Sequence, residues 1–529
     1  MKRTQFLADP AGVFVHSAVL SACERFSSKV ALVDTSTPES PLRITYAQYG
    51  ELVHRLARRF VAAGVRPGDF IAIYLPNSWE FAISYHAATL AGAAATPLNP
   101  SYREREVRYQ LENSGAKILI TDSTLISGMD LSGLPDLRCL YSTRTAPTSG
   151  LLPFTDLLRP TAVALPQPEH DSRVTIAALP YSSGTTGLPK GVMLSHFNLV
   201  SNVYQAYGPG ALSSNPDHRL LCYLPLYHIY GLNVVLNPAL ILGMTIVLMP
   251  RFNVETALRL IAEERITTAP SVPPVLNAFC QAAEKGLFPT NHCLQWIKSG
   301  AAPLAPELAH RLTRLTGVHV AQGYGMTEAS PVTHIGCIDT SDPCPVEAIG
   351  APVYATDCRL MTFDGGEERE AAEGEPGELV MRGPQFMLGY WKSPQSTADV
   401  MRDDWYWSGD VATRDANGYY RIVDRRKEMI KYKGFPVSPA EVEAVLLEHP
   451  AVRDCGVVGR PNAEAGEIPC AFVVLRDEFA DSERVRADIA SFVADRLAHH
   501  KLPREIRLVA QIPRNPSGKI LRRELRSAL

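Results

Sequence analysis

The sequence predicts an α/β protein with a large N-terminal region of several subdomains, whose sheets are largely parallel, and a small α+β C-terminal domain. Three observations support this prediction. The chain has 529 residues, which is too long for one compact core. Short apolar runs alternate with helix-like segments through most of it, as in parallel sheets with crossover helices. Past Phe363, glycines and prolines punctuate an acidic stretch, and a charged run begins at Asp424. We therefore expect domains over residues 1–424 and 425–529.

The individual elements follow from the length and pattern of each segment. Longer segments with one apolar face predict helices over residues 15–26, 51–63, 79–92, 103–114 and 254–264. Short apolar runs predict buried strands over residues 70–75, 117–121, 173–180 and 245–249, with further strands over 378–382 and 418–423. Residues 64–69 read Gly-Val-Arg-Pro-Gly-Asp, which is typical of a helix end followed by a turn.

Composition and charge narrow the class of protein. The formal charge is −3, which argues against nucleic acid as a partner of the whole chain. The ten cysteines show no pairing at metal-ligand spacing, so no structural metal is expected. Residues 220–250 carry no Asp, Glu, Lys or Arg, but prolines interrupt them. They therefore predict a buried helix followed by a strand rather than a membrane span. A cytoplasmic location is the default expectation.

A glycine-rich segment over residues 181–191 has the chemistry of a phosphate-binding loop. It reads Tyr-Ser-Ser-Gly-Thr-Thr-Gly-Leu-Pro-Lys-Gly and follows a predicted strand. Its glycines let the backbone approach an anion, and its hydroxyls and lysine can bind one. It is not a Walker A loop, and its order argues against a flexible linker. The candidate phosphate ligands are Ser182, Ser183, Gly184, Thr185, Thr186, Gly187 and Lys190.

This loop resembles the signature of the adenylate-forming superfamily, which includes acyl-CoA and aryl-CoA synthetases, nonribosomal adenylation domains and beetle luciferases. Further motifs follow in the family's order at residues 322–328, 407–410, 424–435 and 513–519. The resemblance implies that Tyr324 stacks on the adenine and that Thr327 donates to the α-phosphate. It also implies that Glu328 and Thr185 hold Mg²⁺. The remaining nucleotide contacts that it implies come from Gln322, Gly323, Asp410 and Arg425.

The same resemblance assigns roles to the C-terminal domain. Lys519 would drive adenylation, and Lys427 would be the hinge about which the small domain turns as a lid. Lys431, Lys433 and Gly434 would deliver the thiol. Residues 501–529 are basic, which alone fits either a solvated helix face or a phosphate-facing surface; the position of Lys519 favours the second.

The candidate acid pocket resembles that of 4-coumarate–CoA ligases over residues 224–233, 298–304 and 330–332. Its predicted residues are His228, Tyr230, Asn233, Lys298, Gly300, Ala301, Gly325, Pro331 and Val332. His228 would orient or gate the carboxylate. Pro436 replaces a typical glutamine and Thr333 a typical apolar residue, so the acid is left open between a fatty acid of medium or long chain and an aryl acid.

These resemblances together predict an ATP-dependent carboxylic acid–CoA ligase that uses Mg²⁺ and forms an acyl-adenylate. The expected catalytic residues are Lys519, His228, Lys190, Thr327 and Glu328. The alternatives are an enzyme that loads a carrier protein, a luciferase-like oxygenase, and a binding protein without activity. Retention of both Lys190 and Lys519 argues against the last. The oligomeric state is left open, with a homodimer as one option.

Overall fold

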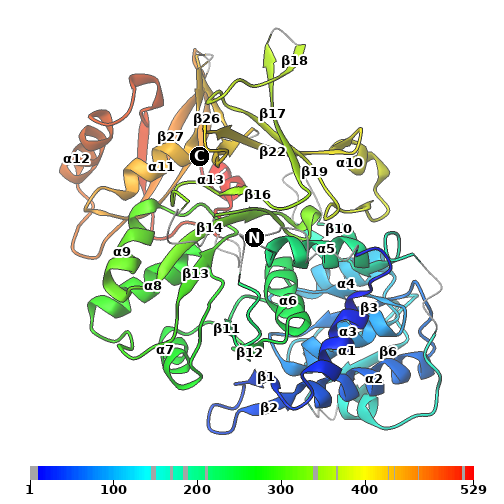
Figure 1. Cartoon of the computed structure of the whole chain (residues 1–529). Helices are drawn as coiled ribbons and strands as arrows, with labels where there is room; N and C mark the ends of the chain where they lie inside the picture. Colours follow the sequence, from blue (N-terminus) through cyan, green and yellow to red (C-terminus); the bar gives the residue numbers. More distant parts are fainter. Residues whose placement is uncertain are drawn as a thin grey trace.

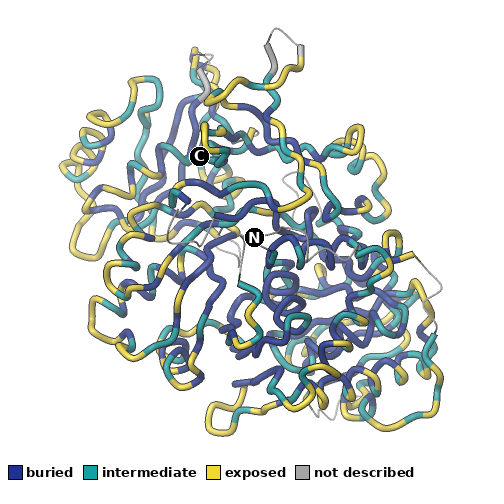
Figure 2. The backbone as a smooth tube through the Cα atoms, in the orientation of Figure 1, coloured by how far each residue is buried: buried dark blue, intermediate teal, exposed yellow. Residues whose placement is uncertain are grey.

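The computed structural model describes residues 10–144, 150–166, 171–182, 189–208, 213–336, 344–364, 367–426, 428–433, 435–462, 464–514 and 519–529. Figure 1 shows the N-terminal sheets and helices in the lower part of the molecule and the C-terminal domain above them at one side. Figure 2 shows that buried backbone is concentrated where the N-terminal helices lie between the sheets.

The first sheet has nine strands and is parallel through its centre. Its order is β20-β10-β8-β4-β3-β5-β6-β7, with β9 paired to β10. The strands are β3 Phe70–Tyr74, β4 Ala94–Pro97, β5 Ile118–Thr121, β6 Cys139–Ser142, β7 Leu151–Pro153, β8 Ile176–Ala178, β9 Tyr181–Ser182, β10 Lys190–Ser195 and β20 Gly389–Tyr390. The helices of this part are α1 Val15–Arg25, α2 Tyr46–Ala62, α3 Trp79–Leu90, α4 Glu104–Ser114 and α5 His196–Ala206, with the 3₁₀ turn η1 Phe154–Leu158.

Two four-stranded sheets form the second part of the N-terminal region. Their orders are β11-β12-β1-β2 and β13-β14-β15-β16, and the isolated bridges from Thr268 to Leu220 and Trp296 connect them. The strands are β1 Val30–Asp34, β2 Leu42–Thr45, β11 Arg219–Cys222, β12 Thr245–Leu248, β13 Trp296–Ser299, β14 His319–Gly325, β15 Val332–Ile335 and β16 Ala351–Pro352. The helical segments are the π-helix η2 Gly231–Leu236, α6 Asn237–Ile241, α7 Val254–Glu263, α8 Pro273–Glu284, α9 Pro306–Thr316 and the 3₁₀ turn η3 Thr327–Ala329.

An antiparallel sheet leads from this region to the C-terminal domain. It contains β17 Asp357–Asp364, β18 Glu367–Glu370, β19 Gly377–Arg382, β21 Met401–Arg402, β22 Trp405–Arg414 and β23 Tyr420–Arg425, beside α10 Pro394–Ala398. The last domain has a separate hydrophobic core. Its elements are β24 Ile430–Tyr432, β25 Phe435–Val437, α11 Pro439–Leu447, β26 Val452–Asn462, β27 Gly466–Leu475, α12 Glu483–Ala494, η4 His499–Lys501, β28 Glu505–Leu508 and α13 Arg522–Ser527.

The structure confirms the predicted fold class and corrects several element boundaries. Helix α2 begins at Tyr46 rather than at residue 51, because Thr45 and Gln48 form a capping box. Strand β8 covers only Ile176–Ala178 of the predicted 173–180. The 220–250 segment begins with strand β11 and then forms a π-helix before β12, so the simple helix–strand prediction was incomplete. Among the helices described, none is long and apolar enough to span a bilayer.

Candidate active site

The predicted phosphate loop is framed by two short antiparallel strands. Ser182 of β9 pairs with Lys190 of β10, so the two ends of the loop lie side by side. Leu179, just before β9, and Gly191 pack closely: a Cβ on Gly191 would lie 3.1 Å from a Leu179 methyl carbon. Ser183, Gly184, Thr185, Thr186 and Gly187 lie outside the described residues.

Glu328 joins the phosphate loop to the neighbouring sheet. It belongs to η3 and its residue is only 8% exposed. Its Oε1 accepts hydrogen bonds from the Ser182 hydroxyl at 3.1 Å and from the Tyr390 hydroxyl at 2.9 Å. Lys190 Nζ lies 5.2 Å from the centroid of the Tyr390 ring, a cation–π distance. The structure therefore brings three predicted site residues, Ser182, Lys190 and Glu328, close together. Thr327 immediately precedes Glu328 in the same turn.

Tyr390 is a residue of this site that sequence reasoning missed. It lies on β20, which pairs with β10 and so lies next to Lys190. Burial raises the pKa of Tyr390, and the nearby Glu328 charge raises it further, so the phenol stays protonated and donates. The only sequence signal was an aromatic pair, Tyr390-Trp391, after a turn, and such a pair is usually core.

The predicted nucleotide motif and the predicted ribose carboxylate meet across two sheets. The Tyr324 hydroxyl donates to Asp410 Oδ2, and Arg425 Nε lies 3.1 Å from Asp410 Oδ1. Asp410 is 6% exposed. The burial of Tyr324 and the negative charge of Asp410 together raise the pKa of Tyr324 well above the usual range. The Tyr324 ring packs edge-on against His334, with 5.9 Å between centroids. Tyr324, Asp410 and Arg425 thus form one hydrogen-bonded and ion-paired cluster.

Gln322 and Gly323 occupy the strand that leads to this cluster. The Gln322 amide donates to the Val346 carbonyl at 2.5 Å and accepts from the Leu304 amide at 3.3 Å. Both ends of the Gln322 side chain are therefore bonded to main chain, which fixes the orientation of its amide group. Gly323 pairs with Ile335 in the β14–β15 ladder.

The C-terminal domain brings Lys519 to the Asp410–Arg425 pair. Burial first and the positive charge of Arg425 second lower the pKa of Lys519, the charge of Asp410 opposes them, and the pKa is about 8. The Lys519 ammonium is therefore near enough to the Asp410–Arg425 pair for both charges to act on it, although the lysine is 94 residues beyond Arg425 in the chain. Lys519 still carries a proton at neutral pH, which is the form that stabilises anionic oxygens.

The predicted thiol-delivery residues lie on a different part of the C-terminal domain. Lys431 and Lys433 are exposed at the β24–β25 hairpin. Their backbone amides donate to Glu467 Oε2 at 2.9 Å and to the Ala465 carbonyl at 2.8 Å, which ties the hairpin to its own domain. The predicted hinge Lys427 and the predicted Gly434 lie outside the described residues.

The acid-pocket residues converge from the loop before η2 and from β13. The Tyr230 hydroxyl donates to the Lys298 carbonyl at 2.9 Å, and a Cβ on Gly300 would lie 3.1 Å from the Tyr230 ring. Lys298 is 3% exposed and its ammonium donates to the Gly336 carbonyl. Ala301, which follows Gly300, is exposed and has a positive φ of 66°.

His228 lies at the start of this wall in its neutral form. Burial lowers the pKa of His228 to about 4. The Tyr230 backbone amide lies 3.2 Å from Nδ1 and donates to it. The single ring proton is therefore on Nε2, because Nδ1 acts as an acceptor. His228 can donate from Nε2 but adds no positive charge at neutral pH.

Further predicted pocket residues lie in the segment after η3. A Cβ on Gly325 would lie 2.0 Å from the Pro331 carbonyl oxygen, so only glycine fits this approach. Asn233 lies behind the wall: its Nδ2 donates to the Ser330 carbonyl at 2.6 Å and to the Leu199 carbonyl at 3.1 Å. Asn233 was predicted to be a pocket residue, and its side chain positions the segment Ser330–Val332.

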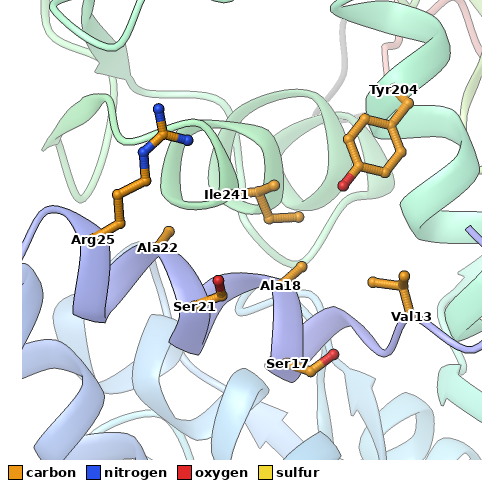
Figure 3. Close-up of a pocket in the computed structure, with 8 residues that line it drawn as sticks. All are labelled: Val13, Ser17, Ala18, Ser21, Ala22, Arg25, Tyr204 and Ile241. Atoms are coloured by element: carbon orange, nitrogen blue, oxygen red, sulfur yellow. The ribbon is translucent and has the colours of Figure 1, made fainter. Parts of the chain in front are cut away.

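A pocket of about 340 Å³ lies elsewhere, between α1, α5 and α6. Figure 3 shows Arg25 at one end of it and Tyr204 and Val13 at the other, with small side chains of α1 along its floor. Its eight lining residues include no predicted site residue. It is therefore distinct from the candidate active site.

Comparison with known proteins identifies the family. Residues 19–391 match the AMP-binding enzyme family, and residues 441–519 match the AMP-binding enzyme C-terminal domain. The chain is 36% identical over 533 residues to 4-coumarate–CoA ligase 1 of Arabidopsis thaliana, covering 98% of this chain and 93% of that protein. ATP-bound MatB from Rhodopseudomonas palustris superposes with a TM-score of 0.85 at 28% identity, covering 97% of this chain and 98% of that one. The anthranilate CoA ligase AuaEII, bound to anthranoyl-AMP, gives 0.85 at 27% identity, with 97% of each chain covered.

The chain belongs to the AMP-binding, or adenylate-forming, enzyme family. Within that family it is an acid–thiol ligase, an acyl- or aryl-CoA ligase that uses ATP and CoA. The domain matches fall on either side of residue 425, but the exact boundary and hinge remain predictions.

Proposed function

We propose that this ligase activates an aryl acid of the 4-coumarate type as its acyl-adenylate and transfers the acyl group to CoA. The observation that carries the proposal is the meeting of three sheets at one place. Lys519 is near enough to Asp410 and Arg425 for both charges to shift its pKa, the Tyr324 hydroxyl bonds to the Asp410 carboxylate, and Glu328 joins η3 to the phosphate loop. Gly300, which packs against Tyr230, directly follows β13, and β13 pairs with β14, the strand that carries Tyr324.

In the first half-reaction a carboxylate oxygen of the acid attacks the α-phosphorus of ATP, and pyrophosphate leaves. Both partners are anions, so the barrier comes largely from repulsion and positioning. Lys190 would neutralise the departing phosphates, Thr327 would donate to the α-phosphate, and Lys519 would bridge the α-phosphate and the carboxylate. His228, neutral and protonated on Nε2, would donate to the carboxylate and orient it.

Mg²⁺ fits this arrangement as an ion held mainly by phosphates. Mg²⁺ commonly binds one or two protein carboxylates together with substrate phosphates and water. Glu328 is a nearly buried carboxylate whose Oε1 already accepts two hydrogen bonds, whereas its Oε2 accepts none from the described residues. Glu328, with Thr185 from the loop, would hold the ion, which would offset the charge of the leaving pyrophosphate.

In the second half-reaction the CoA sulfur attacks the acyl carbon, AMP leaves, and the thiol proton passes to solvent. Lys519 and the exposed Lys431–Lys433 hairpin belong to one domain but face different surroundings. A rotation about Lys427 that withdraws Lys519 and brings in Lys431, Lys433 and Gly434 would serve both steps with one site.

The aryl acid is favoured over a fatty acid by the names of two relatives. The chain is similar along nearly its whole length to a 4-coumarate–CoA ligase of Arabidopsis thaliana and to the anthranilate CoA ligase AuaEII, and both names specify aryl acids. Lys298 does not decide between the two classes, because it is nearly fully buried and its ammonium donates to the Gly336 carbonyl.

The substrate class is tested by measuring AMP release with ATP, Mg²⁺ and CoA over a panel of acids. We expect the highest kcat/KM for 4-coumarate or another cinnamate, with benzoate lower and palmitate lowest. A rate that rises with alkyl length would overturn the aryl assignment in favour of a fatty acid. Acid-dependent pyrophosphate exchange without thioester would instead point to a carrier protein as the acyl acceptor.

A further inference from the structure

The pocket segment Ser330–Val332 has its main chain held on both sides by buried amide side chains. Asn233 binds the Ser330 carbonyl, and Asn202 both donates to the Val332 carbonyl at 2.7 Å and accepts from the Val332 amide at 3.0 Å. Asn202 and Asn233 are each 0% exposed. The position of Pro331, predicted to touch the acid, is therefore set by contacts with α5 and η2 as well as by the β14–β15 ladder.

Behind Asn233, hydrogen bonds continue away from the pocket through three helical elements. Asn237 Nδ2 lies 2.8 Å from Asn233 Oδ1, His86 Nε2 lies 3.0 Å from Asn237 Oδ1, and the Tyr49 hydroxyl lies 2.7 Å from His86 Nδ1. Tyr49 belongs to α2, His86 to α3 and Asn237 to α6. All of these side chains are 0% exposed.

The direction of each hydrogen bond follows from the pocket end. The Asn233 atom between two carbonyl oxygens must be the amide nitrogen, so its Oδ1 faces Asn237. Asn237 then donates with Nδ2 and presents its own Oδ1 to His86. His86 must therefore carry its proton on Nε2, and Nδ1 accepts from Tyr49.

The other neutral tautomer of His86 would be unfavourable. A proton on Nδ1 could be donated to the Ala82 carbonyl at 3.1 Å. The lone pair of Nε2 would then face a lone pair of Asn237 Oδ1, and neither acceptor would have a donor in the buried interior. Burial lowers the pKa of His86 to about 4, so the ring carries a single proton at neutral pH. The four side chains thus form a continuous series of hydrogen bonds, in which each group donates to the next from Tyr49 to the Ser330 carbonyl.

We propose that Tyr49, His86, Asn237 and Asn233, here called the His86 relay, form a positioning network that sets the acid pocket through the Ser330 carbonyl. This inference rests on the proposed function. Buried polar groups are costly unless every one is satisfied, and a satisfied network fixes one geometry. The relay holds the Ser330–Val332 wall in place and so contributes to acid selectivity, although Tyr49, His86 and Asn237 do not touch the acid.

The test compares two substitutions at His86, which reaches the Ser330 carbonyl through two side chains, Asn237 and Asn233. His86→Gln keeps an acceptor for Tyr49 and a donor for Asn237, whereas His86→Phe keeps the volume and loses both. We expect His86→Phe to raise KM for the acid about tenfold, because Tyr49 and Asn237 both lose their partner and the support of the Ser330 carbonyl weakens by roughly the worth of one hydrogen bond. KM for ATP should change less than twofold, and the kcat/KM ratio for two acids of different width should change. His86→Gln should stay close to the unsubstituted enzyme in all three quantities.

A matched control separates positioning from stability. Gln110 is a buried amide that donates to Thr96 Oγ1 at 2.9 Å and the Pro97 carbonyl at 3.0 Å, in the first sheet away from the pocket. Gln110→Leu should lower Tm without changing KM for the acid or the acid ratio. If His86→Phe behaves in the same way, the relay has only a structural role and the proposal is wrong.

Two further outcomes keep the result interpretable. If His86→Phe does not fold, Tyr49→Phe removes one oxygen at the far end of the relay and should give a smaller shift in the acid ratio; no shift would overturn the proposal. If the unsubstituted enzyme forms no acyl-adenylate with any acid, the proposed function fails and the relay has no acid to select. If it turns over acids normally, failure of the His86 test concerns the relay alone.

Discussion

The nucleotide half and the acid half of this site are built in different ways. The nucleotide half consists of charged and hydroxyl side chains that bond to one another, such as Ser182, Glu328, Asp410 and Arg425. The acid half consists of main chain held in position by neutral buried groups such as Asn202 and Asn233. The first arrangement stabilises developing charge, and the second defines a shape. Substitutions should therefore affect rate in the first half and selectivity in the second.

The largest expected effect is that of Lys519→Ala on adenylation. Removing the ammonium beside the α-phosphate should slow acyl-adenylate formation about a hundredfold to a thousandfold, as for other groups that stabilise transition-state charge. Thiolation of supplied acyl-AMP should remain close to normal. The measurement is single-turnover assay of each half-reaction. Lys431→Ala is the matched control on the same domain and should show the opposite pattern; equal loss of both steps in Lys519→Ala would contradict the assignment.

Tyr390→Phe should have the next largest effect. The change removes the hydroxyl that donates to Glu328 and leaves the ring beside Lys190. A hydrogen bond to a charged group contributes about 1.5–3 kcal/mol, so we expect adenylation to slow roughly tenfold to a hundredfold, with the acid preference unchanged. Tyr181 lies in the same sheet as Tyr390, and its hydroxyl donates to Asn113 of α4, so Tyr181→Phe should have little effect on adenylation. A changed acid preference in Tyr390→Phe would remove the distinction between the two halves.

The pH dependence of adenylation should sharpen the role of Lys519. Its pKa is lowered to about 8 by burial first and by Arg425 second. The protonated lysine is the active form, so kcat/KM for ATP should fall as pH rises through about 8. Bound phosphate stabilises the ammonium, so the corresponding fall in kcat should occur at higher pH. Lys519→Arg, if it retains activity, should lose this decline, because arginine keeps its charge. A decline that persists in the variant belongs to another group.

The two halves also differ in how far they could be predicted from sequence. The predicted nucleotide residues lie in compact motifs, so Lys190, Tyr324, Glu328, Asp410 and Arg425 could be proposed as site residues from sequence alone. The positions of most of the predicted helices and strands agree with the structure within a few residues for the same reason, since the pattern is local. Tyr390 and Asn202 were missed because they act across long sequence separations and resemble ordinary core residues. The acid itself could not be predicted, because selectivity depends on the exact position of the backbone at Pro331.

The smallest expected effect concerns His228, in the acid half. Burial lowers its pKa to about 4, and its Nδ1 accepts from the Tyr230 amide, so it is already neutral at pH 7. An acid with a pKa near 4 should therefore show nearly constant kcat/KM between pH 5.5 and pH 7, because neither the acid nor His228 titrates there. His228→Gln retains a neutral donor and should keep the same flat profile with a modest rise in KM for the acid. A decline near pH 6.5 that disappears in His228→Gln would show instead that His228 is charged in the working enzyme, and the acid half would then act through charge as the nucleotide half does.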